Sequence, residues 1–226
     1  MATPASATLP VTSRTRLGRY PVRGSFDRAA IHAILDEGFI CHVAFVSAGQ
    51  PVCVPTGYGR SGDLLYLHGS AASRMMRTLA DGVDVCVTVT IVDGLVLARS
   101  AFHHSMNYRS VMVFGRARVV EDAEEKAVAL TALTNHIVPD RWDGLRPVTA
   151  QELAATTVLA LPIEEASAKM RSGPPKDDAE DVTWPVWAGV VPVGLRIGDP
   201  MPDADVGADV APFDVTALRR ARAGVS

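Results

Sequence analysis

The strongest constraint on the fold is a series of short apolar runs, rich in β-branched residues, with turn sequences between them. In "FICHVAFVSAGQPVCVPTGYGRSGDLLYLHG" the breaks "SAGQ" and "RSGD" lie at hairpin spacing. We therefore predict three antiparallel strands over about residues 39–47, 51–58 and 64–69. The later segment "VDVCVTVTIVDGLVLARSAF" places Asp93-Gly94 between two β-branched runs, which predicts another hairpin.

Later segments add more strands and connecting helices. "SVMVFGRARVV", residues 110–120, predicts a strand, and "TTVLALPI" and "WPVWAGVVPV" predict two more. Helices are predicted from a cap at Ser25 to about Glu37, within "SAASRMMRTLADG", and after a cap at Asp122. The order shows no β-α-β rhythm. It therefore predicts a mainly β fold with connecting helices, in which six to eight strands form an antiparallel barrel.

The length of 226 residues suits one globular domain with extended ends. Residues 1–24 carry four arginines among Pro, Ser, Thr and Gly without apolar periodicity, and predict an N-terminal arm. Residues 25–197 are predicted to form the domain. Residues 198–226 predict a loose C-terminal tail with one helical turn near residues 215–223.

Charge and cysteine content narrow the functional classes. The net charge of −3 at pH 7 gives no broad basic field for nucleic acid or for an anionic membrane. The first residues lack the apolar core of a signal peptide and no apolar run is long enough to cross a bilayer, so we expect a cytoplasmic protein. The three cysteines have no C-x-x-C spacing, which predicts reduced, packed thiols and no metal site.

The passage from strand to helix at "YLHGSAASRMMR" predicts an anion site. A helix start leaves backbone N–H groups unpaired and carries the positive end of the helix dipole. Gly69 lets a ligand approach the backbone, and the hydroxyls of Ser70 and Ser73 with the guanidinium groups of Arg74 and Arg77 suit a phosphate. A simple helix cap beside solvated arginines is the alternative, because the segment matches neither a Walker loop nor a dinucleotide fingerprint.

Three blocks of the sequence carry a resemblance to a known family: "VCVPTGYGRSGDLLYLHGSAASRMMRTLADGVDVCVTVT", "NYRSVMVFGRARVV" and "WAGVVP". They resemble FMN-binding split-barrel proteins of the pyridoxamine 5′-phosphate oxidase-like superfamily, most of all the flavin-nucleotide-binding branch that includes the nitroimidazole-resistance proteins. The similarity runs from about Arg19 to Pro192. It implies a split β-barrel and a homodimer with FMN at its interface.

The resemblance also implies places around the flavin. The phosphate is expected at the strand-to-helix junction, the isoalloxazine ring along the second barrel strand, where Tyr58 is a further candidate, and the partner's flavin against the strand that begins near Ser110. An aromatic side chain near the flavin corresponds to Trp187. The implied cofactor-binding residues are Pro55, Thr56, Tyr66, His68, Gly69, Ser70, Ser73, Arg74, Tyr108, Arg109, Ser110 and Trp187.

His68 is the implied catalytic residue, because the nitroimidazole-resistance branch carries a histidine at this position. Its imidazole is expected to donate a hydrogen bond to the ring or the substrate and to supply a proton; a histidine satisfied by backbone at a strand end is the alternative. Tyr66 shares a strand face with His68, so it is either a flavin contact or a core residue. His32 and His136 are expected on helix surfaces.

The implied function is an FMN-dependent oxidoreductase that passes hydride or electrons to a small acceptor, with a donor such as NAD(P)H. True pyridoxamine 5′-phosphate oxidase activity is not expected, because those enzymes end with an Arg-x-His pair and no histidine follows His136 here. The alternatives are a flavin-binding or sensing module without turnover, a deazaflavin or haem protein, and a ligand-free dimeric scaffold. A haem would take its axial ligand from His68, His103 or His104.

Overall fold

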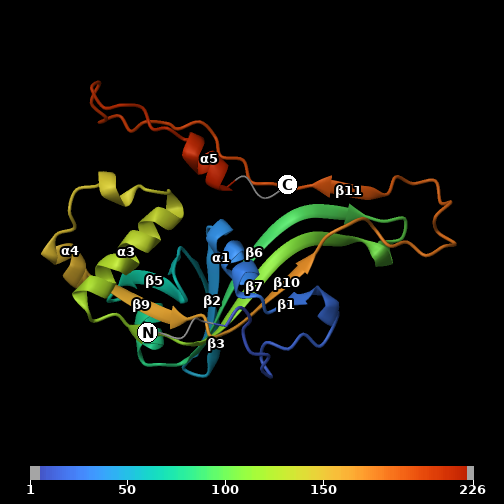
Figure 1. The fold of residues 1–226 in the computed structure, drawn as a ribbon, viewed down its shortest axis with the longest axis horizontal. Coiled ribbons are helices and arrows are strands. Elements are labelled where there is room, and N and C mark those ends of the chain that lie inside the picture. The colour runs from blue at the N-terminus through green and yellow to red at the C-terminus, as the bar shows by residue number, and fades with distance from the viewer. Residues whose placement is uncertain (1–5, 223–226) are drawn as a thin grey trace.

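The computed structural model describes residues 6–222, which form two antiparallel sheets with helices packed on them (Figure 1). The first sheet has the order β1-β10-β7-β6-β2-β3, with β11 also paired to β6, and the second has the order β4-β5-β9-β8. This is the predicted split β-barrel. The strands are β1 (Gly24–Ser25), β2 (Cys41–Ser47), β3 (Gln50–Thr56), β4 (Gly59–Ser61), β5 (Leu64–Ser70), β6 (Asp84–Leu97), β7 (Ser105–Arg116), β8 (Arg118–Val119), β9 (Thr156–Pro162), β10 (Glu165–Arg171) and β11 (Gly189–Pro192); the helices are α1 (Arg28–Glu37), α2 (Arg74–Ala80), α3 (Ala123–Ile137), α4 (Ala150–Ala155) and α5 (Thr216–Arg222).

Helix α1 packs on the inner side of the first sheet and buries Ile31, Ile34 and Leu35 against its β-branched residues. Its N-cap is Asp27, whose carboxylate accepts a hydrogen bond from the Ala30 amide at 2.8 Å. The predicted cap, Ser25, is wrong because that residue already pairs with β10 in the sheet. The helix ends before Gly38, as predicted.

The hairpin predicted at Asp93-Gly94 is also wrong. Strand β6 continues through both residues and stays paired with β7, with a β-bulge in which Asp93 is the extra residue. Gly94 lets β11 pack closely on β6, since a Cβ at this residue would lie 3.0 Å from the Val190 side chain of β11. The chain reverses beyond Leu97 instead, so the strand predicted over 110–120 begins at Ser105.

A second apolar cluster lies between the second sheet and α3. The β4 residue Gly59 approaches this helix so closely that a Cβ would lie 2.6 Å from the Leu133 amide nitrogen. His136, expected on the surface, is buried: its Nε2 lies 2.6 Å from the Gly38 carbonyl oxygen, and its ring centroid lies 4.4 Å from that of Tyr58. Tyr58 is therefore a core residue and not a flavin contact.

The N-terminal end of the described chain packs into the core, whereas the C-terminal end runs along the surface. Leu9, in the predicted N-terminal arm, is buried and belongs to the main apolar cluster, so part of this arm joins the core. After β11 the chain runs in extended form along the upper side of the molecule and ends in α5, close to the predicted helical turn (Figure 1). Within residues 6–222 no helix combines the length and apolar character needed to cross a membrane.

Candidate functional site

Several predicted residues lie together on the side of the first sheet that faces away from α1. Directly opposed residues of antiparallel strands point to the same side. The core residues Val43, Val87 and Val113 form one such row, so the alternate residues form the opposite side, which we call the outer face. The outer face carries Pro55, His42, Thr88 and Met112 in one row, Thr90 and Ser110 in the next, and Val92 and Tyr108 beyond them.

The same alternation removes two predicted residues from this face. Thr56 follows Pro55 and points inward, opposite the buried Cys41. Arg109, between Tyr108 and Ser110, also points inward, to the side opposite these two residues. The resemblance could not reveal this separation, because it carried over three consecutive residues as one block.

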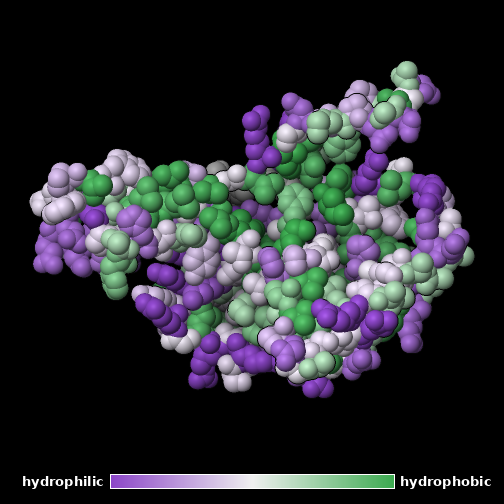
Figure 2. Space-filling model, turned by 180° about the vertical axis from the view of Figure 1, so that it is seen from behind, coloured by the Kyte–Doolittle hydropathy of each residue, from purple (hydrophilic) through white to green (hydrophobic). Residues whose placement is uncertain are grey.

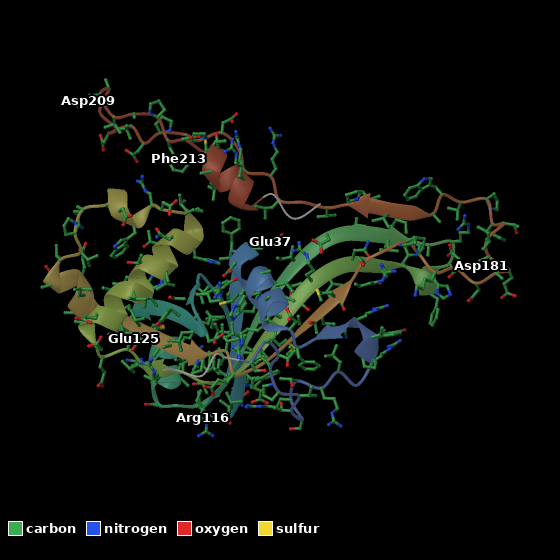
Figure 3. The ribbon with its side chains drawn as sticks, in the orientation of Figure 1. Glu37, Arg116, Glu125, Asp181, Asp209 and Phe213 are labelled. Atoms are coloured by element: carbon green, nitrogen blue, oxygen red, sulfur yellow. The ribbon has the colours of Figure 1, made fainter. Side chains whose placement is uncertain are left out.

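Arg109 instead joins three elements of its own subunit. Its guanidinium donates to both carboxylate oxygens of Glu37 at the end of α1, one at 2.8 Å, and to both of Asp93 in the β6 bulge at 3.0 and 2.7 Å. These hydrogen bonds, to Asp93 first and then to Glu37, raise the pKa of Arg109. Figure 3 shows Glu37 at the upper end of α1. This cluster fixes the helix against the bulge.

A cavity of about 520 Å³ lies beside this cluster. Strand β2 pairs with β6 only as far as Thr88, and β11 begins to pair at Gly94, so the edge of β6 is open between them. The cavity is lined by Ile40, His42, Thr90, Val92, Arg109 and Leu195, among others. His42 is exposed, and its imidazole has no hydrogen-bond partner among residues 6–222. Sequence reasoning missed it, although its alternation with the apolar residues of the 39–47 strand could have indicated an outward side chain.

The outer face is apolar and uncovered. Val46, Val92, Met106 and Met112 are exposed on it, and Met106 opposes Leu95, which in turn opposes Val191. Apolar residues gather on the side of the molecule seen in Figure 2. Contiguous exposed apolar surface of this kind marks an interaction site in a soluble protein.

The strand-to-helix junction lies at the end of the second sheet. His68, Ser70 and Arg74 are exposed, and no hydrogen bond or ion pair involves the side chain of His68 or Arg74 within residues 6–222. Ser70 Oγ accepts from the Ala72 amide at 3.2 Å, and the Ser73 amide donates to the Ser70 carbonyl at 2.9 Å. Ser73 occupies the N-cap of α2 without a capping hydrogen bond. The first amides of this helix are therefore left uncapped.

Tyr66 lies away from the junction, beneath α3. It is buried in the second apolar cluster, and its hydroxyl donates to Glu125 Oε1 at 3.3 Å. Burial, followed by the charge of Glu125, raises the pKa of Tyr66. The core interpretation of this residue is therefore correct.

The remaining predicted aromatic and histidine residues lie around the loops beside β11. Trp187 is exposed, and its ring covers Gly189, where a Cβ would lie 2.8 Å from the indole. His103 Nε2 lies 3.1 Å from Asp178 Oδ2. His104 Nδ1 lies 2.8 Å from the Ser100 carbonyl oxygen, which leaves Nε2 of that ring available. Both histidines belong to a 3₁₀ turn and its cap, not to a strand.

The cysteines occupy different environments. Cys41 is buried in the core, and burial raises the pKa of its thiol to about 12. Cys86 is half-buried, and burial also raises its pKa. Cys53 is exposed, so the prediction of packed thiols does not hold for it. Among residues 6–222, no three His, Cys, Asp or Glu side chains are grouped to hold a metal ion.

Known proteins resemble this chain over most of its length. The flavocytochrome Anf3 from Azotobacter vinelandii is 42% identical, with 92% of this chain and 96% of that one covered and a TM-score of 0.85. The FAD- and haem-binding protein from Mycobacterium smegmatis is 40% identical, with coverage of 88% and 96% and a TM-score of 0.81.

A protein proposed to give 5-nitroimidazole resistance in Bacteroides thetaiotaomicron is more distant, at 26% identity, 63% and 83% coverage and a TM-score of 0.52. No curated protein matches the chain. The family model described as pyridoxamine 5′-phosphate oxidase matches residues 27–170, which is more than half of the chain. The protein therefore belongs to the pyridoxamine 5′-phosphate oxidase family of flavin-binding split-barrel proteins.

Proposed function

We propose that this protein is a flavin- and haem-binding redox protein that passes electrons from its reduced flavin to a small acceptor. The observation that carries the proposal is the similarity, at 42% and 40% identity over nearly the whole chain, to a flavocytochrome and to a FAD- and haem-binding protein. We favour FAD over the FMN expected from the sequence, because FAD is the flavin named for the second of these relatives.

The flavin has two regions of the chain available to it in this proposal. Its phosphates lie at the junction, where Arg74 is exposed and α2 begins without a capping side chain. Uncapped amides and a guanidinium group are the donors that a phosphate prefers. Its ring lies on the outer face near Pro55, with Tyr108 and Ser110 of a second subunit against it. Arg109, Tyr66 and Thr56 have no part in this site.

The haem iron requires an imidazole with a free nitrogen as its ligand. His68 and His42 have no hydrogen-bond partner within residues 6–222, and His104 keeps Nε2 available, whereas His103 already contacts Asp178 through Nε2. We assign the axial ligand to His68. A haem bound there would lie next to the proposed flavin, and electron transfer between the two groups needs them close together. His42 is the second candidate, because it lines the cavity at the open edge of β6.

We further propose that the protein is a homodimer that buries the outer face, as the sequence resemblance implies. The exposed apolar side chains of that face, together with the placement of Tyr108 and Ser110 on it, support this arrangement. The bound flavin and haem supply the electron transfer, while the chain holds them in place and excludes water from the interface.

The test is an absorbance spectrum of the purified protein, followed by heat release and chromatographic identification of the flavin. We expect a flavin band, FAD in the supernatant and a Soret band that His68→Ala shifts or abolishes while His42→Ala leaves it unchanged. The reverse result for the two variants would move the ligand to His42. A protein that takes up neither flavin nor haem would overturn the proposal. Absence of NADH or NADPH turnover by the loaded protein would favour the non-catalytic binding module.

A further inference from the structure

The segment between β11 and α5 touches its own barrel only at its start, where the Val193 amide donates to the Asp93 carbonyl oxygen and Leu195 lines the cavity beside β6. We call residues 195–215 the C-terminal arm. Within residues 6–222, no hydrogen bond or ion pair joins this arm to the two sheets or to α1–α4. Its contacts are local: Arg219 of α5 donates to the carbonyl oxygens of Ile197 and Gly198 and pairs with Asp199 at 2.7 Å. The hydrogen bonds of the arm thus join it to α5 and not to the barrel.

The arm nevertheless carries apolar side chains. Leu195 is 72% exposed and Met201 is 94% exposed, and Val206, Val210 and Phe213 are exposed as well. Fixing each residue of such a segment costs about 1–2 kcal/mol of backbone entropy, which only burial or hydrogen bonding recovers. In Figure 2 the far part of the arm stands clear of the body. An ordered arm therefore needs a surface outside its own subunit.

The charge of the arm indicates what that surface is. It contains five aspartates and a single cation, Arg196, at its start. Asp199 pairs with Arg219, whereas Asp203, Asp205 and Asp209 have no cationic partner within residues 6–222. Figure 3 shows Asp209 at the far end of the arm. The arm thus presents three uncompensated negative charges beside apolar side chains.

The complementary charge lies near the N-terminus of the chain. Arg16, Arg19 and Arg23, which we call the basic rim, have no carboxylate partner within residues 6–222. Arg23 lies at the border of the outer face, because the next residue, Gly24 of β1, pairs with Lys169 of β10, and Lys169 opposes Ser110. Arg16 and Arg19 precede it in the chain.

In its own subunit the arm runs towards the α3 side, away from the N-terminal segment beside β10 (Figure 1). The rim that the arm can meet therefore belongs to another copy. We propose that the C-terminal arm of one subunit lies on the basic rim and adjoining outer face of a second copy, so that two subunits exchange arms. This inference rests on the proposed homodimer and names the contact that holds it together.

Two charge-reversed proteins test the exchange. The arm variant carries Asp203→Lys, Asp205→Lys and Asp209→Lys, and the rim variant carries Arg16→Glu, Arg19→Glu and Arg23→Glu. Each alone places like charges together in a homodimer, so we expect its dimer Kd to rise at least tenfold at 50 mM salt. Mixed, the two variants match at both contacts only if the arm acts between subunits. We therefore expect heterodimers far above the statistical half, measured by native mass spectrometry, with the preference falling at 0.5 M salt.

A statistical mixture of dimers, unchanged dimer Kd values or a mixture that stays monomeric would each overturn the arm exchange. The control reverses Arg141 to glutamate, an exposed arginine between α3 and α4 that has no ion-pair partner among residues 6–222, and should leave the dimer Kd unchanged; circular dichroism checks that all variants fold. The flavin and haem content of the unmodified protein is measured by absorbance alongside its dimer Kd. A dimer that lacks both cofactors would overturn the proposed function without affecting the test of the arm.

Discussion

Arg74 is the residue on which the flavin site depends most, because its guanidinium is exposed and unpaired within the described chain. Arg74→Ala removes a charge-assisted hydrogen bond to phosphate, which costs on the order of 1.5–3 kcal/mol, or about a 10- to 150-fold weaker flavin Kd. Flavin titration by fluorescence quenching measures it, with Arg141→Ala as the control away from the junction. An unchanged Kd for Arg74→Ala would remove the proposed anchor.

Gly59 shows how closely two backbones approach at one position. A Cβ at this residue would lie 2.7 and 2.8 Å from the Ala132 carbonyl carbon and oxygen of α3, and backbone atoms cannot turn aside as a flexible side chain can. We expect Gly59→Ala to lower the free energy of unfolding by about 1–3 kcal/mol.

Gly57→Ala is the matched control, since nothing lies within 4 Å of a Cβ there, and its effect should stay within about 0.5 kcal/mol. Urea midpoints at unchanged slope measure both. Equal stabilities of the two variants would mean that β4 and α3 can separate without cost.

Among the elements, α1, β6 and β7 depend on one another through Arg109. Its removal leaves Glu37 and Asp93 without their shared cation in a partly buried place, where the side chains are 21% and 34% exposed. We expect Arg109→Ala to lower the free energy of unfolding by about 2 kcal/mol, and Arg109→Lys to recover less than half, because an ammonium group cannot form the two-sided fork.

The flavin Kd of a folded Arg109→Ala protein should stay within about threefold, because the guanidinium points away from the outer face. Chemical denaturation and flavin titration of the same preparation separate the two effects. A large loss of flavin affinity at unchanged stability would return Arg109 to the cofactor site.

The loop between β10 and β11 is held by Asp177, whose side chain is only 4% exposed. It accepts from the Arg99 amide and guanidinium, both at 2.7 Å, and these contacts lower its pKa. A lowered pKa gives a contribution that is complete above about pH 4, the value of a free aspartate, and is lost as pH falls through the lowered value.

We therefore expect the fluorescence of Trp184 and Trp187, in this loop, to change only below about pH 4 in a Trp142→Phe background. Asp177→Ala should show the acid spectrum already at pH 7. Identical pH profiles of the two proteins would indicate that the loop is held elsewhere.

The elements also show what the sequence can predict. Period-two alternation located β2, β3, β5 and β9 to within a few residues, because it depends on local burial. It could not distinguish a turn from a bulge at Asp93, since the partners that keep that strand straight, Arg109 and Val193, are distant in the sequence. For the same reason Tyr66 stayed open between core and flavin contact, and His136 was wrongly expected on a helix surface: α3, which carries His136 and covers Tyr66, packs on the second sheet only after the chain has folded.

At the junction the site stays a prediction, whereas on the sheet the structure separates residues that the sequence had grouped. Gly69 to Arg74 are consecutive, so their composition could suggest an anion site, and the structure shows Arg74 exposed and α2 without a capping side chain. Arg109 was assigned to the flavin with Tyr108 and Ser110, but the strand pleat places it on the other side. His42 had no motif around it, and only the break between β2 and β11 makes it line a cavity.

At the scale of the whole molecule, the outer face of the first sheet is apolar and exposed in the single subunit. We expect the homodimer to form by burying this face. Met112 lies at the centre of this outer face and is 41% exposed in the single subunit. Met112→Asp would place a charge inside a dimer interface, at a cost of several kcal/mol, so we expect the dimer Kd to rise at least tenfold, with loss of bound flavin. Light scattering over a dilution series measures the mass.

Val128→Asp on α3 is the matched control, because Val128 is 49% exposed and lies away from the outer face, and it should leave both mass and flavin unchanged. A Met112→Asp protein that remains a flavin-loaded dimer at every dilution would show that the subunits meet elsewhere. A flavin-loaded monomer would show instead that one subunit suffices for the site, since Tyr108 and Ser110 of the partner would then be dispensable.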